Sequence, residues 1–144
     1  MHKVLVAFDG SKPSERAVAY VINLSAEMKQ PLEIHLLNVQ QEPVLFGEDY
    51  LSADMIEELG KSLLDKSGAL LKEAGKQLEQ ADVVFTLHPA VGNIAEKIHG
   101  MVKDLGCDTI VMGTRGLGSF SGLLLGSVAT RVLHDVQIPV VLIK

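Results

Sequence analysis

Glycine and hydroxyl residues at fixed spacing mark the segment of this chain best suited to binding chemistry. Gly113 and Gly116 are followed, after nine further residues, by Gly126 and Ser127. Glycines let the backbone approach a ligand closely, and the N–H groups that open a helix attract anions. The segment 109–134 contains no Asp or Glu, although the chain has 18 such residues among 144, so an anion there meets little repulsion. This pattern predicts a cradle for phosphate groups.

Two other phosphate-binding motifs do not match this segment. A Walker loop ends in Gly-Lys-Ser/Thr, but no lysine precedes Ser127. The dinucleotide fingerprint would require a glycine where Ser121 stands, and it would follow the first strand rather than the fourth. One structural alternative remains, namely a connection whose glycines only satisfy turn geometry.

The segments that must position these glycines alternate between strand and helix patterns. Strands are predicted at 3–8, 32–39, 82–87, 109–112 and 138–143, and helices at 13–29, 52–80, 93–105 and 126–136. This alternation is typical of an α/β fold with a doubly wound, five-stranded parallel sheet, Rossmann-like, of strand order 3-2-1-4-5. Ligands bind such sheets beyond the carboxyl ends of the strands, where Asp9, Val39 and Gly113 fall. Residues 40–51 are predicted to form a long loop.

Composition places limits on the class of protein. A chain of 144 residues fits one domain spanning 1–144. A net charge of −5 argues against a nucleic-acid surface, and no apolar run approaches the length of a membrane span. The single cysteine, Cys107, excludes an internal disulfide and fits a reducing compartment. We therefore expect a cytoplasmic protein without a nucleic-acid or membrane partner.

Several motifs taken together resemble the universal stress protein family. They are Asp9-Gly10-Ser11, the strand end Leu37-Asn38-Val39, the run from Asp108 to Gly116, and Gly126-Ser127-Val128. The resemblance covers essentially the whole chain, and the spacing of the glycines is that family's ATP-binding signature. One departure is Asn93-Ile94, where the family usually has Asp-Pro. Because Asn caps a helix as well as Asp, this change affects rigidity more than the choice of ligand.

The resemblance also implies roles for individual residues. Asp9 and the backbone of Val39 would meet the adenine of ATP. The ribose and phosphates would be lined by Gly113, Arg115 and Gly116, and the β- and γ-phosphates held by Gly126, Ser127 and Val128. From the residues alone, Asp9 is either a ligand contact or a helix cap. Arg115 either pairs with phosphate or is a solvated loop residue.

The residues give little support to efficient catalysis. None of the five histidines is paired at metal-ligand spacing with another His or with Cys, so any Mg²⁺ is expected to arrive on the nucleotide phosphates. An efficient ATPase needs a group that activates water at the γ-phosphate, and no residue is identified for that role. At most, slow ATP hydrolysis is expected.

These observations lead to one principal hypothesis and two alternatives. We expect an ATP-binding, nucleotide-dependent regulatory protein of the stress response that forms a homodimer through the uncharged edge strand Ile138–Ile143. One alternative is a flavin- or adenylyl-handling enzyme on a similar sheet, although Asp9-Gly10-Ser11 replaces the His-x-Gly-His loop of such transferases. The other is an interaction module with a vestigial nucleotide loop.

Overall fold

The computed structural model describes residues 1–43, 51–118 and 124–144. Its elements alternate along the chain: β1 (Lys3–Ala7), α1 (Lys12–Glu27), β2 (Glu33–Gln40), α2 (Ala53–Gln80), β3 (Phe85–Val91), α3 (Ile94–Leu105), β4 (Thr109–Gly113), α4 (Ser127–Asp135) and β5 (Val140–Ile143). The strands pair in parallel in the order β3-β2-β1-β4-β5. The expected fold class and strand order are confirmed.

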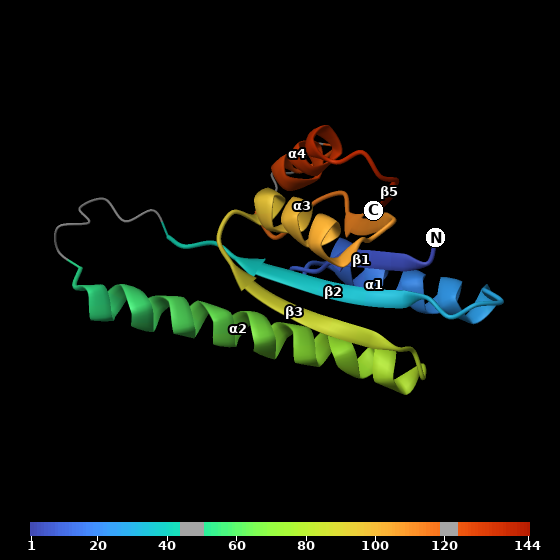
Figure 1. Ribbon diagram of the computed structural model, residues 1–144, viewed down its shortest axis with the longest axis horizontal. Helices are drawn as coiled ribbons and strands as arrows, with labels where there is room; N and C mark the ends of the chain where they lie inside the picture. Colours follow the sequence, from blue (N-terminus) through green and yellow to red (C-terminus); the bar gives the residue numbers. More distant parts are fainter. Residues whose placement is uncertain (44–50, 119–123) are drawn as a thin grey trace.

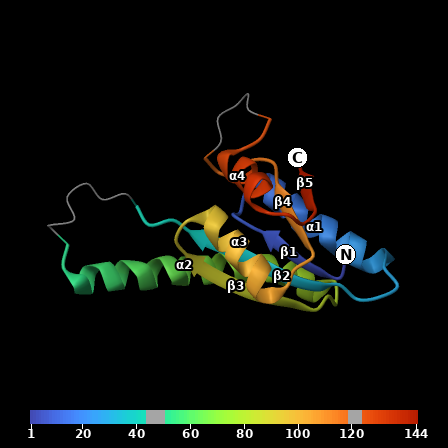
Figure 2. The same ribbon diagram turned by 45° about the horizontal axis from the view of Figure 1, so that its top comes forward.

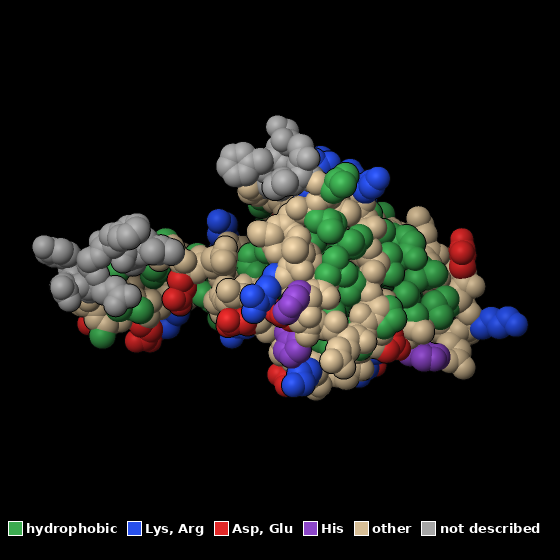
Figure 3. Space-filling view, turned by 90° about the horizontal axis from the view of Figure 1, so that it is seen from above, with side chains coloured by type: hydrophobic (Ala, Val, Ile, Leu, Met, Phe, Trp, Pro, Cys, Tyr) green, Lys and Arg blue, Asp and Glu red, His purple; other side chains and the backbone are tan. Residues whose placement is uncertain are grey.

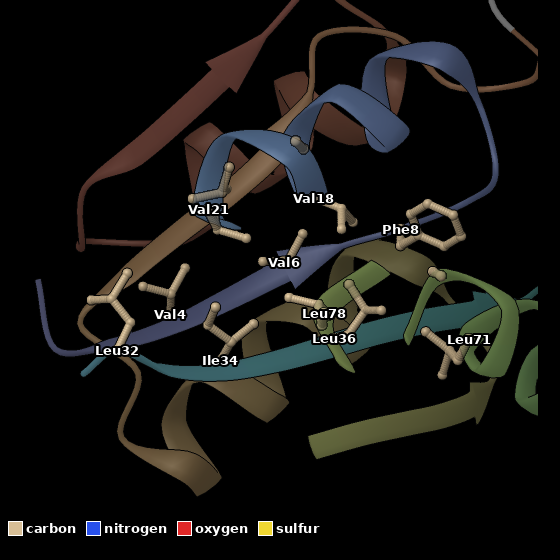
Figure 4. Close-up of a cluster of buried hydrophobic side chains, with 13 residues drawn as sticks. Val4, Val6, Phe8, Val18, Val21, Leu32, Ile34, Leu36, Leu71 and Leu78 are labelled. Atoms are coloured by element: carbon tan, nitrogen blue, oxygen red, sulfur yellow. The ribbon is translucent and has the colours of Figure 1, made fainter. Parts of the chain in front are cut away.

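The helices cover both faces of the sheet, so the central strands β1, β2 and β4 are buried along most of their length. α1 and α2 lie on one face, and α3 and α4 lie on the other (Figures 1 and 2). Each face has its own hydrophobic cluster; on the first, Val6 and Ile34 pack with Val18 and Leu71 (Figure 4). Side chains point to alternate faces of a strand, so a strand covered on both sides is buried at nearly every residue.

Polar residues start the first three helices. Side-chain oxygens of Ser11, Ser52 and Asn93 each accept a hydrogen bond from a backbone N–H three residues later. α3 ends at Gly106, whose φ of 66° is accessible to glycine at little cost. The residues that begin and end these helices act locally, which is why Ser52, Asn93 and Gly106 could be identified from the sequence.

The third strand begins later than expected. The predicted bounds 82–87 are wrong, because the structure has β3 at Phe85–Val91. After α2, the Val83 N–H donates to the Leu78 carbonyl and Asp82 adopts a φ of 55°, so these residues serve the turn. Pro89 lies within the strand, and an edge strand tolerates proline because one side of its backbone needs no partner.

The sheet brings the carboxyl ends of β1, β2 and β4 to one edge. Asp9, Val39 and Gly113 lie there together, as expected for a parallel sheet with this strand order. The N-terminal part of α2 extends beyond the sheet, and within this helix the buried residues begin only at Ser67 (Figure 1). Most of the predicted loop, residues 44–50, lies outside the described residues.

Candidate functional site

A cleft of about 560 Å³ opens at the carboxyl ends of these strands. This volume lies in the usual range for small-molecule sites. It gathers every site residue predicted from the sequence, namely Asp9, Val39, Gly113, Arg115, Gly116, Gly126, Ser127 and Val128. These residues come from four separate segments of the chain. Their meeting at one cleft is a consequence of the sheet topology.

Asp9 connects the end of β1 to the glycine loop. Its Oδ1 accepts from the Ser11 N–H at 2.9 Å, and its Oδ2 accepts from the Leu117 N–H at 3.2 Å. The residue that caps α1 is Ser11, so Asp9 is not the helix cap that the sequence left open. Each carboxylate oxygen can accept more than one hydrogen bond, which leaves Asp9 able to contact a ligand in the cleft as well.

The backbone of Val39 points toward the space beyond β1. The Phe8 N–H donates to the Leu37 carbonyl at 2.9 Å, so Leu37 faces β1. The Gly92 N–H donates to the Gln40 carbonyl at 2.9 Å, so Gln40 faces β3. Because backbone groups alternate sides along a strand, the N–H and C=O of Val39 face the side of β1, where the chain has already left the sheet. The edge of a planar ligand at this point would meet the N–H donor of Val39 beside its C=O acceptor.

Asn38 forms a side-chain network that sequence reasoning did not assign to the site. Its Nδ2 donates to the Phe8 carbonyl at 2.8 Å, and its Oδ1 accepts from Gln40 Nε2 at 2.9 Å. Asn38 is only 2% exposed, and both ends of its side-chain amide are hydrogen-bonded. An asparagine flanked by Leu37 and Val39 at the end of a predicted strand is the signal that could have identified this network.

Two glycines of the signature are needed for contacts within the fold. A Cβ on Gly113 would lie 2.7 Å from the Pro13 Cβ, so a side chain there would displace the first turn of α1. A Cβ on Gly116 would lie 2.6 Å from Asp9 Oδ2. At Gly126, by contrast, the nearest atom would be 3.5 Å away, an ordinary contact. Contacts within the fold therefore explain the glycines at 113 and 116 without a ligand, but they do not explain Gly126.

The start of α4 differs from the starts of the other three described α-helices. Its first-turn N–H groups have no side-chain cap, because Gly126 occupies the N-cap position. The Gly126 N–H itself donates to the Thr114 carbonyl at 2.8 Å, so the available donors begin at Ser127. Ser127 is exposed and lies in the cleft wall with Val128. An uncapped helix start facing a cleft favours an anionic ligand.

Charge in the described part of the cleft is limited to Asp9 and Arg115. Arg115 is exposed at the cleft, and Ser11 Oγ donates to its carbonyl at 3.5 Å. Arg131 instead pairs with Asp135, Nε to Oδ2 at 2.6 Å, on the surface of α4. Arg131 is therefore a surface residue, and Arg115 is the cation placed to meet a ligand.

Other polar groups lie away from the cleft. His35 Nδ1 and His88 Nε2 are 2.9 Å apart, and Glu33 Oε1 lies 3.0 Å from His35 Nε2. Burial, and then the neighbouring His35, hold the pKa of His88 below its usual value. Burial raises the pKa of the Cys107 thiol to about 11, which makes this thiol unreactive.

Residues 1–43, 51–118 and 124–144 contain no group of three or more His, Cys, Asp or Glu side chains arranged to hold a metal ion. No helix within those ranges is long and apolar enough to cross a membrane.

Comparisons with known proteins agree with the fold and the motifs. The model of the universal stress protein family matches residues 1–144. Universal stress protein YxiE of Bacillus subtilis is 29% identical over 148 residues, covering 99% of each chain. The structure of MJ0577, a universal stress protein of Methanocaldococcus jannaschii, has a TM-score of 0.82 at 26% identity, covering 99% of this chain and 94% of that one.

A further solved structure carries a ligand. It is a universal stress protein in complex with cAMP, with a TM-score of 0.67 at 26% identity, covering 99% of this chain and 97% of that one. The family match over the whole length, the sheet order and the glycine spacing all agree. The chain belongs to the universal stress protein family.

Proposed function

We propose that this protein binds ATP in the cleft at the carboxyl ends of β1, β2 and β4, and acts as a nucleotide-dependent regulator. The observation that carries the proposal is that eight predicted site residues from four segments line a single cleft of about 560 Å³. The cAMP complex of a related protein supports an adenine nucleotide as the class of ligand. A cytoplasmic location is proposed with it, on the ground that the single cysteine allows no internal disulfide, which fits a reducing compartment.

The base would bind on the β2 side of the cleft. The backbone of Val39 offers an N–H beside a C=O, which matches adenine because that base has an acceptor nitrogen beside its amino donor. Guanine has the reverse polarity at the same edge, so it would leave both backbone groups unsatisfied. Asp9, at the end of β1, also lines this cleft and is a second candidate contact for the base.

The phosphates would bind on the β4 side. Ser127 and Val128 supply N–H groups at the uncapped start of α4, and Ser127 adds a hydroxyl donor. Arg115 supplies the positive charge. Mg²⁺ would be carried on the phosphates, since the described residues offer no carboxylate cluster for it. At most slow hydrolysis is expected, because no described residue in this part of the cleft is a clear activator of water.

We also propose that the protein forms a homodimer through β5. The carbonyls of Pro139 and Ile143 accept from β4, so by alternation the N–H and C=O of Leu142 point away from the sheet at its edge. Half-buried apolar residues lie along the segment from α4 to β5, namely Val136, Ile138, Val140 and Leu142. Hydrophobic side chains gather on the face that carries α3 and α4 (Figure 3). A second copy could cover both features through a twofold contact.

The nucleotide proposal is tested by the thermal midpoint of unfolding with Mg-ATP, with Mg-GTP and with buffer. A ligand at a hundred times its dissociation constant adds about 2.7 kcal/mol, which shifts a domain of this size by several degrees. We expect a rise with ATP and little with GTP. No rise, with no nucleotide released on denaturation, would favour an interaction module with a vestigial loop. A yellow preparation would favour the flavin alternative.

The dimer proposal is tested with Leu142→Pro and the matched control Leu142→Ala. Both variants shorten the side chain, but only proline removes the N–H at the edge of the sheet. We expect light scattering to give a dimer mass for wild type and Leu142→Ala, and a monomer mass for Leu142→Pro. A dimer mass for all three proteins would place the interface elsewhere.

A further inference from the structure

Asn38 joins the two strand ends that form the base side of the cleft. Its Nδ2 donates to the Phe8 carbonyl at 2.8 Å, and Gln40 Nε2 donates to its Oδ1 at 2.9 Å. A backbone carbonyl only accepts hydrogen bonds, so the Phe8 contact determines which end of the Asn38 amide faces it. In that orientation the Asn38 Oδ1 faces Gln40, so Gln40 must present the NH2 of its side-chain amide. The donors and acceptors of this network can therefore be arranged in only one way. Asn38 itself is only 2% exposed.

The residues that this network holds are neighbours of the proposed base contacts. Phe8 precedes Asp9, and Gln40 follows Val39. Phe8 lies one residue past the end of β1, where the chain turns toward α1. The Asn38 side chain therefore bridges β2 to the departing chain at the point where the backbone ladder of β1 ends.

We infer that Asn38 is a positioning residue that sets the preference of the cleft for adenine over guanine, an inference that rests on the proposed function. The two bases differ in polarity at the edge that Val39 would contact. Hydrogen bonds weaken within a few tenths of an ångström and steeply at poor angles, so the discrimination requires a fixed Val39 backbone. A displaced strand end binds ATP less tightly and rejects GTP less strongly.

Ser67, in α2, provides a matched control because it contacts the same strand. Its Oγ donates to the Asn38 carbonyl at 2.9 Å and accepts from the Ala90 N–H at 3.4 Å. Ser67 is fully buried, but it faces β3 and does not line the cleft. Ser67→Ala therefore removes a buried hydrogen bond at Asn38 without touching the side-chain network. It reports the effect of general destabilisation.

The experiment measures dissociation constants of wild type, Asn38→Asp, Gln40→Leu and Ser67→Ala for Mg-ATP, Mg-GTP and inorganic tripolyphosphate. Asn38→Asp keeps the size and the acceptor for Gln40, but it sets an oxygen against the Phe8 carbonyl. We expect the ratio of ATP to GTP affinity to fall about tenfold in Asn38→Asp, which corresponds to one lost hydrogen bond. The ratio falls less in Gln40→Leu and is unchanged in Ser67→Ala. Tripolyphosphate affinity is unchanged in all four proteins.

The outcomes separate this inference from the proposed function. Wild-type protein that binds neither nucleotide would overturn both. Adenine preference that persists in Asn38→Asp would overturn the role of Asn38 and leave nucleotide binding standing. Equal loss of ATP, GTP and tripolyphosphate binding would assign Asn38 a purely structural role. If Asn38→Asp fails to fold, Gln40→Leu carries the test, because Gln40 is only partly buried and loss of its amide breaks the other half of the network.

Discussion

The two walls of the cleft are built on different physical principles. The wall formed by β1 and β2 is held by polar side chains, with Asn38 bonded to Phe8 and to Gln40. The wall formed by β4 and α4 is held by close backbone packing, with Gly113 against Pro13. The first wall is sensitive to the loss of a donor or acceptor, and the second is sensitive to the addition of a single carbon.

Gly113→Val would have the largest effect on stability, because it disrupts the wall formed by β4 and α4. The added Cβ would lie 2.7 Å from the Pro13 Cβ and 3.2 Å from the Pro13 carbonyl carbon, so backbone must move. We expect a loss of stability of about 1–3 kcal/mol or more, with or without ATP. Urea unfolding measures it, with Gly118→Val as control because a Cβ there meets no atom within 4 Å. Equal stability of the two variants would contradict the packing argument.

Gly116→Ala tests the contact between the two walls. Its Cβ would lie 2.6 Å from Asp9 Oδ2, and the displaced carboxylate would lose its bond to the Leu117 N–H. We expect a cost of about 1 kcal/mol in wild type and a smaller cost in an Asp9→Ala background, because neighbouring substitutions are not additive. A double-mutant cycle by urea unfolding measures the coupling. Full additivity would mean that Asp9 and Gly116 do not interact.

Gly126→Ala separates ligand binding from folding. Its Cβ would make only an ordinary contact of 3.5 Å with the Arg115 Cα, and the φ of −75° suits any residue. We expect stability to fall by less than about 1 kcal/mol, the usual cost of alanine at an N-cap. ATP affinity should fall more, since the methyl group adds bulk where the cleft meets α4. Calorimetric titration checks this, and an unchanged dissociation constant would exclude Gly126 from the site.

The smallest expected effect is on how stability depends on pH, and it comes from His88, which lies outside both walls. The pKa of His88 is lowered from 6.5 in the fold, so the folded state binds fewer protons than the unfolded chain. Stability should therefore decrease as pH falls below about 6.5. The pKa of Glu33 is also lowered, by Lys3 and then His35, but its contribution is lost only at pH values below about 4.5.

Urea unfolding at pH 7.5 and pH 5.5 measures the histidine effect, with His88→Gln as the comparison. The decrease should be smaller in His88→Gln than in wild type. The same decrease in both proteins would assign the pH dependence to another group. The ratio of ATP to GTP affinity should be unchanged by His88→Gln, because His88 does not line the cleft.

Most of the fold could be predicted because its signals are local. Ser52 and Asn93 cap helices through hydrogen bonds that span three residues, and Gly106 ends a helix through its own φ. The start of β3 could not be predicted in this way. It depends on the turn that follows α2 and on the edge position of Pro89, both of which are properties of the assembled sheet.

The sequence by itself determined the strand and helix order, the glycine spacing and the residues expected at the cleft. These follow from periodicity and from residue types that act over a few positions. Only the tertiary structure decided what each of these residues touches. Pro13 beside Gly113, and Phe8 beside Asn38, are contacts between segments far apart in the chain. Such contacts arise when parallel strands place distant segments side by side, and no local pattern records them.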